Sequence, residues 1–109
     1  MSQKPIKKTD GQLYALLEEK IANGNYVFLK HAQDRQQERQ ISDIEVLDIL
    51  EGKKGRNRKH NKIKDHYLTG YQDWNYCIEG TDLDGKKIRI IVSFMEDLVP
   101  IITVIRIDN

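Results

Sequence analysis

The chain is expected to fold as a single α+β domain, in which N-terminal helices pack on an antiparallel sheet of about four strands. Two capping boxes, Thr9 with Gln12 and Ser42 with Glu45, each stand before apolar residues at helical spacing. The C-terminal third instead alternates apolar and polar residues between turn signals. Helices followed by a run of strands predict the α+β class.

Length and composition limit the class of protein. The chain has 109 residues, which is the length of one domain, and one cysteine, Cys77. A single cysteine excludes an intramolecular disulfide and favours a reducing compartment. His60 and His66 lack the companions that a metal site requires, so no metal or cofactor is expected. The basic N-terminus, residues 1–8, has no apolar signal segment and is expected to be flexible in a cytoplasmic protein without membrane association.

The first half of the chain predicts a helix, a strand and a second helix. The first capping box opens a helix with an apolar face, and Asn23 and Gly24 end it. Residues 26–29 have the aromatic and β-branched content of a strand. The second capping box opens a helix in which Ile44, Leu47 and Leu50 are expected to be buried.

Between that strand and the second capping box lies a helix with almost nothing apolar on it. Residues 33–40 are all polar or charged, so the helix needs another reason to form. His31, Arg35 and Arg39 are spaced four residues apart, which places them on one helical face. A histidine with two guanidinium groups indicates an anion site. In the alternative interpretation, these side chains only form ion pairs and backbone hydrogen bonds.

The net charge of +1 hides a basic segment. Residues 52–66 hold seven basic side chains and one acidic side chain, so the rest of the chain is acidic. Residues 53–69 show no periodicity and are expected to form a long basic loop or insertion. Nearby Tyr67 and Tyr71 add aromatic rings that are able to stack on bases.

The C-terminal third predicts a meander. Residues 74–80 form one strand, Asp84 and Gly85 mark a turn, and residues 87–94 form the next strand. The last strand covers residues 99–107, with Pro100 near its start. An exposed edge of this meander would allow a homodimer.

Parts of this pattern resemble an uncharacterised bacterial family, domain-of-unknown-function family four-two-five-eight, which is grouped with RelE-like and barnase-like small ribonuclease and toxin folds. The specific part is His31-Ala32, Arg35, Arg39 and Ile41-Ser42, with a looser match around Thr103. The resemblance runs from residue 26 to about residue 106 and leaves the first helix and the basic segment outside the family pattern. It implies an RNA-directed activity with a site on the sheet face.

The activity that the resemblance implies is metal-independent RNA cleavage of the toxin–antitoxin type, with RNA and an antitoxin protein as partners. His31 would transfer protons, Arg35 and Arg39 would hold phosphate oxygens, and Thr103 would orient the phosphate or His31. Lys30 and Glu38 are the candidates for a second proton-transfer group. The side chains expected to contact RNA are Lys30, Lys53, Lys54, Arg56, Arg58 and Lys59.

Two other interpretations stay open at this point. In the first, the chain is a non-catalytic module of the same fold that binds nucleic acid or an acidic protein through its basic segment. Alternatively, it is a structural interaction protein whose His/Arg cluster only ties a helix to the sheet.

Overall fold

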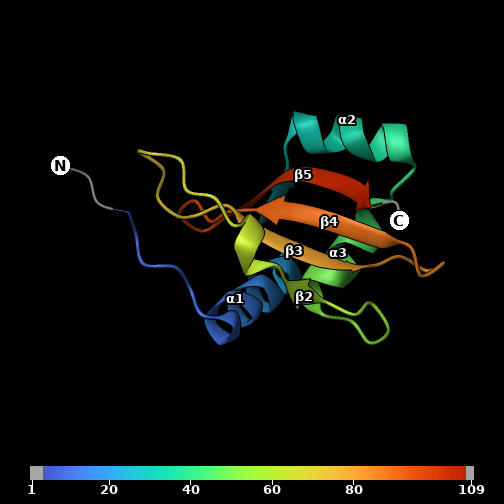
Figure 1. Cartoon of the computed structure of the whole chain (residues 1–109), viewed down its shortest axis with the longest axis horizontal. Helices are drawn as coiled ribbons and strands as arrows, with labels where there is room; N and C mark the ends of the chain where they lie inside the picture. Colours follow the sequence, from blue (N-terminus) through green and yellow to red (C-terminus); the bar gives the residue numbers. More distant parts are fainter. Residues whose placement is uncertain (1–3, 108–109) are drawn as a thin grey trace.

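The computed structural model describes residues 4–107 and confirms the α+β class. Its elements follow the order α1 (Asp10–Ala22), β1 (Tyr26–Phe28), α2 (Lys30–Arg39), α3 (Asp43–Glu51), β2 (Lys59–His60), the 3-10 turn η1 (Lys62–Lys64), β3 (Tyr76–Thr81), β4 (Lys87–Val92) and β5 (Val99–Ile107). Figure 1 shows α2 along the top of the sheet and α1 below it. Over residues 4–107, no helix has the length and apolar character needed to cross a membrane.

The sheet contains five strands in the order β1-β5-β4-β3-β2. The strands β3, β4 and β5 form the expected antiparallel meander. At one edge, β1 pairs with β5 in parallel, and at the other edge β2 pairs with β3 in antiparallel orientation. The sheet is therefore mixed and differs from the expected four antiparallel strands. Parallel pairing of β1 is possible because two helices and the meander separate it from β5 in the chain.

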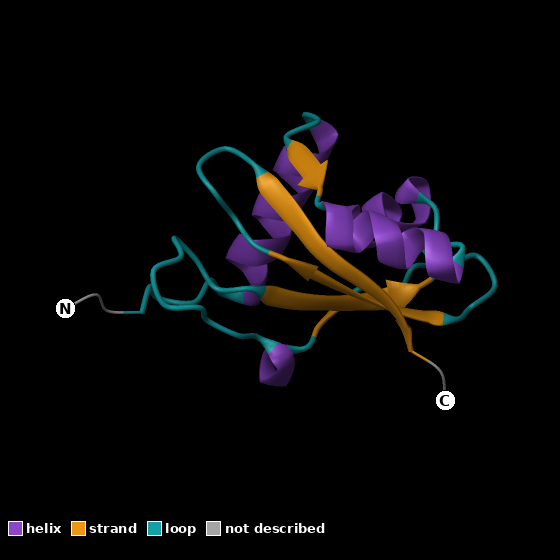
Figure 2. Ribbon diagram, turned by 90° about the horizontal axis from the view of Figure 1, so that it is seen from above, coloured by secondary structure: helices purple, strands orange, loops and turns teal. Residues whose placement is uncertain are grey.

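The helices lie on one side of the sheet and η1 lies on the other (Figure 2). Both capping boxes are present, and they start α1 and α3 where the sequence predicts. The buried residues of these helices are Leu13, Leu17, Ile21, Val46, Ile49 and Leu50. The expected burial of Ile44 is wrong, because α3 turns Val46 and Ile49 to the core and leaves Ile44 69% exposed.

Polar contacts and one small residue hold the polar helix α2 in place. Its two buried residues are Ala32, which allows close approach to the sheet, and Gln36. The amide nitrogen of Gln36 donates to the carbonyl of Ile41 (3.3 Å) and to Asp43 Oδ1 (2.7 Å). Arg106 donates to the carbonyl of Arg39 (3.3 Å), which ties the last turn of α2 to β5. These contacts explain why a helix without an apolar stripe forms at this position.

A β-bulge changes which side chains of β5 face away from the helices. Ile91 pairs with Thr103 while Val92 pairs with Ile101, so Ile102 is the extra residue. Consequently Ile101 and Val104 are buried in the core, whereas Ile102 and Thr103 are both half-buried. The bulge therefore presents Thr103 on the open face of the sheet.

The basic segment is more ordered than a plain loop, since β2 and η1 lie within it. Its residues His60 and Asp65 have buried side chains. In the segment expected to be flexible, residues 1–3 lie outside the described residues, and the residues that follow contact the body. The indole nitrogen of Trp74 donates to the carbonyl of Pro5 (2.8 Å), and Lys8 Nζ forms an ion pair with Asp73 (2.6 Å).

Candidate functional site

The structure brings the four predicted site residues together in one cavity. His31, Arg35 and Arg39 come from one face of α2, and Thr103 comes from the bulged part of β5. With Val104 and Ile105 they line a cavity of about 350 Å³. The helical repeat explains the alignment of the first three side chains. Thr103 joins them because α2 lies along β5, an arrangement that no local sequence pattern indicates.

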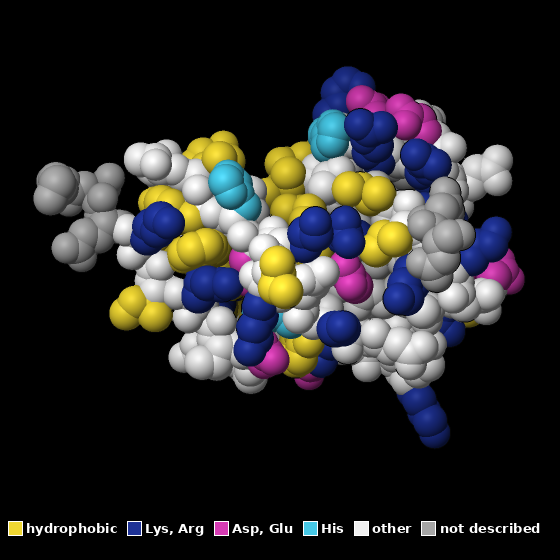
Figure 3. Space-filling view, in the orientation of Figure 1, with side chains coloured by type: hydrophobic (Ala, Val, Ile, Leu, Met, Phe, Trp, Pro, Cys, Tyr) yellow, Lys and Arg dark blue, Asp and Glu magenta, His cyan; other side chains and the backbone are white. Residues whose placement is uncertain are grey.

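The two guanidinium groups of this cavity are engaged differently. Arg35 Nη1 lies 3.2 Å from the carboxylate of Glu38, and both side chains are about half exposed. Within residues 4–107, the guanidinium of Arg39 forms no ion pair. An exposed ion pair such as Arg35–Glu38 contributes little to stability, so both guanidinium groups remain accessible to an anion. Figure 3 views the molecule from the open face of the sheet, where lysine and arginine side chains are spread from α2 downward.

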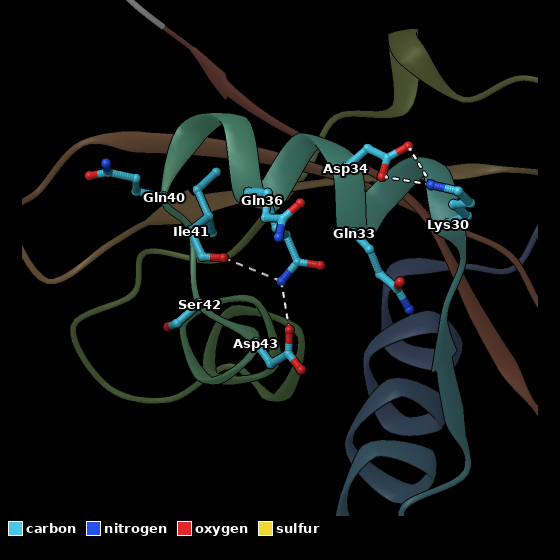
Figure 4. A pocket seen from close by; sticks show the side chains of 9 residues that line it. Lys30, Gln33, Asp34, Gln36, Gln40, Ile41, Ser42 and Asp43 are labelled. Carbon is cyan, nitrogen blue, oxygen red and sulfur yellow. Dashed lines mark hydrogen bonds and ion pairs between the residues drawn. The ribbon is translucent and has the colours of Figure 1, made fainter.

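Lys30 does not belong to this cavity. Its ammonium group pairs with Asp34 (3.1 Å), and both residues line a different cavity of about 700 Å³ between α2 and the start of α3 (Figure 4). Four of the nine residues that line that cavity are glutamines, and two of them, Gln33 and Gln36, lie on the other side of α2 from His31. Lys30 is therefore badly placed to exchange a proton at the His31 cavity. Glu38, beside Arg35, is the nearer of the two candidates.

The basic segment lies at the opposite edge of the sheet from α2. It contains β2, which the strand order separates from β5 by β4 and β3 (Figure 1). Arg58 uses its guanidinium within the fold, because it donates to the carbonyl of Leu50, pairs with Glu18 (both 2.9 Å) and stacks over the ring of Tyr14. Arg56 donates to the carbonyl of Thr81 (3.4 Å).

The lysines of the segment are more available for contacts with RNA than its arginines. Lys53 lies 3.9 Å from Glu51, which is a weak contact, and Lys54 and Lys59 are exposed. Of the predicted RNA-contacting residues, these three therefore present exposed ammonium groups at this edge of the sheet.

A chain of contacts supports the wall of the His31 cavity. The guanidinium of Arg106 donates both to Asp82, which is buried, and to the carbonyl that ends α2 at Arg39. Burial raises the pKa of the Asp82 carboxyl, but hydrogen bonds from Arg106 and from backbone N–H groups outweigh burial. The pKa of Asp82 is thus lowered from its ordinary value of 3.8. Loss of this ion pair would free the end of α2.

Acid is expected to weaken the fold through this ion pair. Because the pKa of Asp82 is lower in the folded than in the unfolded chain, the pair stabilises the fold above about pH 3.8 and is lost as the pH falls through the lowered value. Asp82→Asn keeps an oxygen for the backbone N–H groups but removes the charge. We expect the variant to melt below the wild type at pH 7 and the difference to shrink below pH 4 in melting curves recorded across this range. Parallel curves down to pH 2 would contradict this role.

The structure also contains a charged cluster that the sequence does not indicate. The ring of His60 lies between two carboxylates, with Nδ1 2.8 Å from Asp10 and Nε2 2.8 Å from Asp65. Lys7 Nζ adds an ion pair with Asp65 (2.9 Å), and Asp65 also accepts a hydrogen bond from the backbone N–H of Cys77. The hydrogen bond with His60 is the main cause that lowers the pKa of Asp10.

This cluster is structural, because the side chain of His60 is only 1% exposed and does not reach a substrate. It joins α1, β2 and η1 across 50 residues of chain. Such separation leaves no local signal in the sequence.

Comparison with known proteins adds one finding. The profile of a family described as "Domain of unknown function (DUF4258)" matches residues 28–106. The match contains all four residues of the His31 cavity, and it also contains the basic segment, which the sequence interpretation placed outside the family pattern. No curated protein and no solved structure matches the chain.

Proposed function

The chain belongs to the DUF4258 family, and from the cavity that this family's region forms we propose that it is a metal-independent endoribonuclease of the toxin–antitoxin type. The observation that carries the proposal is the meeting of one imidazole, two guanidinium groups and one hydroxyl in a single open cavity. Fold grouping with RelE-like and barnase-like proteins supports the proposal only as an analogy. The chemistry of the side chains is the stronger argument.

Arg35 and Arg39 supply the phosphate-binding part of the mechanism. Guanidinium groups match phosphate oxygens with two parallel hydrogen bonds, whereas a lysine offers only a point charge. One helical turn separates the two arginines, so they contact one phosphate from the same side. As the 2′-oxygen attacks phosphorus, negative charge grows on the non-bridging oxygens, and the guanidinium groups stabilise it.

His31 supplies the proton transfer. Imidazole is the side chain that exchanges protons near neutral pH. The neutral ring of His31 accepts the proton of the 2′-hydroxyl while that oxygen forms its bond to phosphorus. The leaving 5′-oxygen departs on the opposite side of phosphorus, so a second group must give it a proton as its bond to phosphorus breaks, and Glu38 beside Arg35 is the nearer candidate. The products are a 2′,3′-cyclic phosphate and a 5′-hydroxyl, with no net uptake of protons.

A second candidate function follows from one gap in this site. Apart from His31, the described residues that line the cavity include no second histidine, carboxylate or lysine that could transfer a proton. A protein of the same fold that holds RNA without cutting it needs only the arginines. This binding module is the alternative to the nuclease.

The two candidates differ in their response to the 2′-hydroxyl. The nuclease cuts an RNA oligonucleotide and binds, without cutting, the same sequence carrying 2′-O-methyl groups. The binding module retains both oligonucleotides intact. Absence of binding to either oligonucleotide in a filter-retention assay at low salt would reject both functions.

The lysines of the basic segment are expected to extend the RNA contact toward the β2 edge. Replacing Lys53, Lys54 and Lys59 together with glutamine should make the slope of log K against log salt less negative by about 2, as for three lost contacts to single-stranded RNA. Arg56 and Arg58 are left in place because their guanidinium groups bond within the fold. Binding titrations at several salt concentrations measure the slope. An unchanged slope would remove the segment from the RNA surface.

A further inference from the structure

A second cavity of about 460 Å³ lies beside the His31 cavity and has a different character. Its lining residues are mostly apolar or aromatic: Leu29, Gly70, Tyr71, Gln72, Ser93, Phe94, Met95, Glu96, Pro100 and Ile102. Several of these apolar side chains stay in contact with solvent, with Met95 54% exposed, Tyr71 50% and Leu29 39%. Exposed apolar surface of this kind inside a concave site marks a binding region.

The two cavities adjoin along two pieces of chain. Leu29, the N-cap of α2, lines the apolar cavity, and His31 lines the cationic one. On β5, Ile102 lines the apolar cavity and the next residue, Thr103, lines the cationic one. Neighbouring residues of a regular strand point to opposite faces, but the bulge at Ile102 removes that alternation. Figure 3 shows apolar side chains between α2 and the loops at the left of the molecule.

The walls of the apolar cavity are held by hydrogen bonds. The turn that follows β4 is closed by two backbone hydrogen bonds between Met95 and Leu98, each 3.0 Å. The N–H of Glu96 donates to the side-chain oxygen of Gln72 (2.9 Å), which joins this turn to the loop that carries Tyr71. The hydroxyl of Tyr67 donates to the carbonyl of Tyr71 (3.1 Å). These bonds fix the walls of the cavity relative to one another, which limits the entropy cost of binding.

We propose that this apolar cavity holds the base of a nucleotide whose adjoining phosphate is bound by Arg35 and Arg39. The inference rests on the proposed function and adds a base-binding subsite to it. A nucleotide is the ligand that has a flat, weakly polar ring one sugar away from an anion. Tyr71 and Phe94 provide aromatic surface for stacking, and Met95 provides a side chain that adapts to different rings. At the rim, Gln72 and Glu96 offer polar groups to the edge of the base.

Tyr71→Ala is the variant that tests the subsite. The side chain of Tyr71 is half exposed, so its removal should leave the fold intact, unlike removal of Phe94, which packs on the core. Leu83→Ala is the control, because Leu83 is 77% exposed and lines neither cavity. The substrate is a DNA oligonucleotide with a single ribonucleotide, which fixes the cleavage position. It is prepared in intact form and with an abasic residue on either side of the scissile phosphate.

One of the two abasic substitutions is expected to lower the cleavage rate of the wild type and of Leu83→Ala by roughly 10- to 100-fold, which is the effect of one lost stacking contact. Tyr71→Ala should cut the intact and abasic substrates at similar, low rates. Equal sensitivity of Tyr71→Ala and Leu83→Ala to the abasic residue would overturn the subsite and leave the nuclease standing. A protein segment would then be the alternative occupant of the apolar cavity.

Fluorescence separates failure of the subsite from failure of the nuclease. An all-DNA oligonucleotide carrying 2-aminopurine beside the target phosphate binds without being cut, and stacking on Tyr71 should quench it. Quenching by the wild type and its loss in Tyr71→Ala support the subsite even for a protein that does not cut RNA. Absence of quenching by the wild type, with oligonucleotide bound, overturns the subsite.

Discussion

Replacing Arg39 with alanine is expected to lower kcat/KM for RNA cleavage by roughly 100- to 1000-fold, the effect of removing one preorganised donor from a transition-state site. The melting temperature should stay close to that of the wild type. Among the described residues the guanidinium of Arg39 has no ion-pair partner, and the bond between Arg106 and Arg39 uses the backbone carbonyl, which the variant keeps. Initial rates on one RNA oligonucleotide, with melting curves alongside, measure both quantities.

Two further variants make this result specific. Arg39→Lys retains the charge but loses the paired hydrogen bonds, so it should recover only part of the activity. Lys86→Ala removes one exposed charge from a residue that does not line the cavity and keeps the backbone N–H that bonds to Asp82, so it should cut RNA as the wild type does. A large fall in the melting temperature of Arg39→Ala would instead indicate that the arginine ties α2 to the sheet, as the structural interpretation holds.

Replacing His60 with alanine is expected to lower the free energy of unfolding by about 3 kcal/mol, because it removes a buried partner of the Asp65 carboxylate and leaves that group with Lys7 and the Cys77 N–H. The ring of His60 contacts a carboxylate through each of its two nitrogens, so it joins α1 to β2 and to Asp65, the residue that follows η1. In a domain of this size such a loss corresponds to a fall in Tm of more than about 10 °C. Thermal and urea unfolding both measure it.

The matched control is His66→Ala, a second histidine in the same segment. His66 bonds to Asn75 through its backbone, which the substitution keeps, so its Tm should change by only a few degrees at most. If His60→Ala and His66→Ala both have the Tm of the wild type, His60 does not stabilise the basic segment. The Tm of Asp10→Asn should lie between those of His60→Ala and His66→Ala, since the Asp10 side chain is 47% exposed.

Local sequence signals predicted most of the fold. The capping boxes of Thr9 and Ser42 located α1 and α3, and period-two alternation located β4. The signals failed where structure depends on distant partners. The short strand β2 has no alternation of its own and forms by pairing with β3, and the bulge at Ile102 interrupts an otherwise regular pattern.

The candidate site, like the fold, was predicted in part from local sequence signals and depends in part on distant contacts. The alignment of His31, Arg35 and Arg39 follows from helical geometry alone and was visible in the sequence. The position of α2 along β5 depends on Ala32, on Gln36 and on the bond from Arg106, so the meeting with Thr103 needed the structure. The residues that line the apolar cavity come from separate parts of the chain, namely Leu29, residues 70–72, residues 93–96 and the start of β5. No single stretch of sequence therefore predicts this cavity.

The most direct test of the ribonuclease proposal is the identity of the fragment ends. Purified wild-type protein and a folded His31→Ala variant are each incubated with mixed-sequence RNA in the presence of EDTA. We expect fragments with 2′,3′-cyclic phosphate and 5′-hydroxyl ends from the wild type alone. Intact RNA with the wild type, or the same fragments from His31→Ala, would contradict an RNA-cleaving site at this cavity.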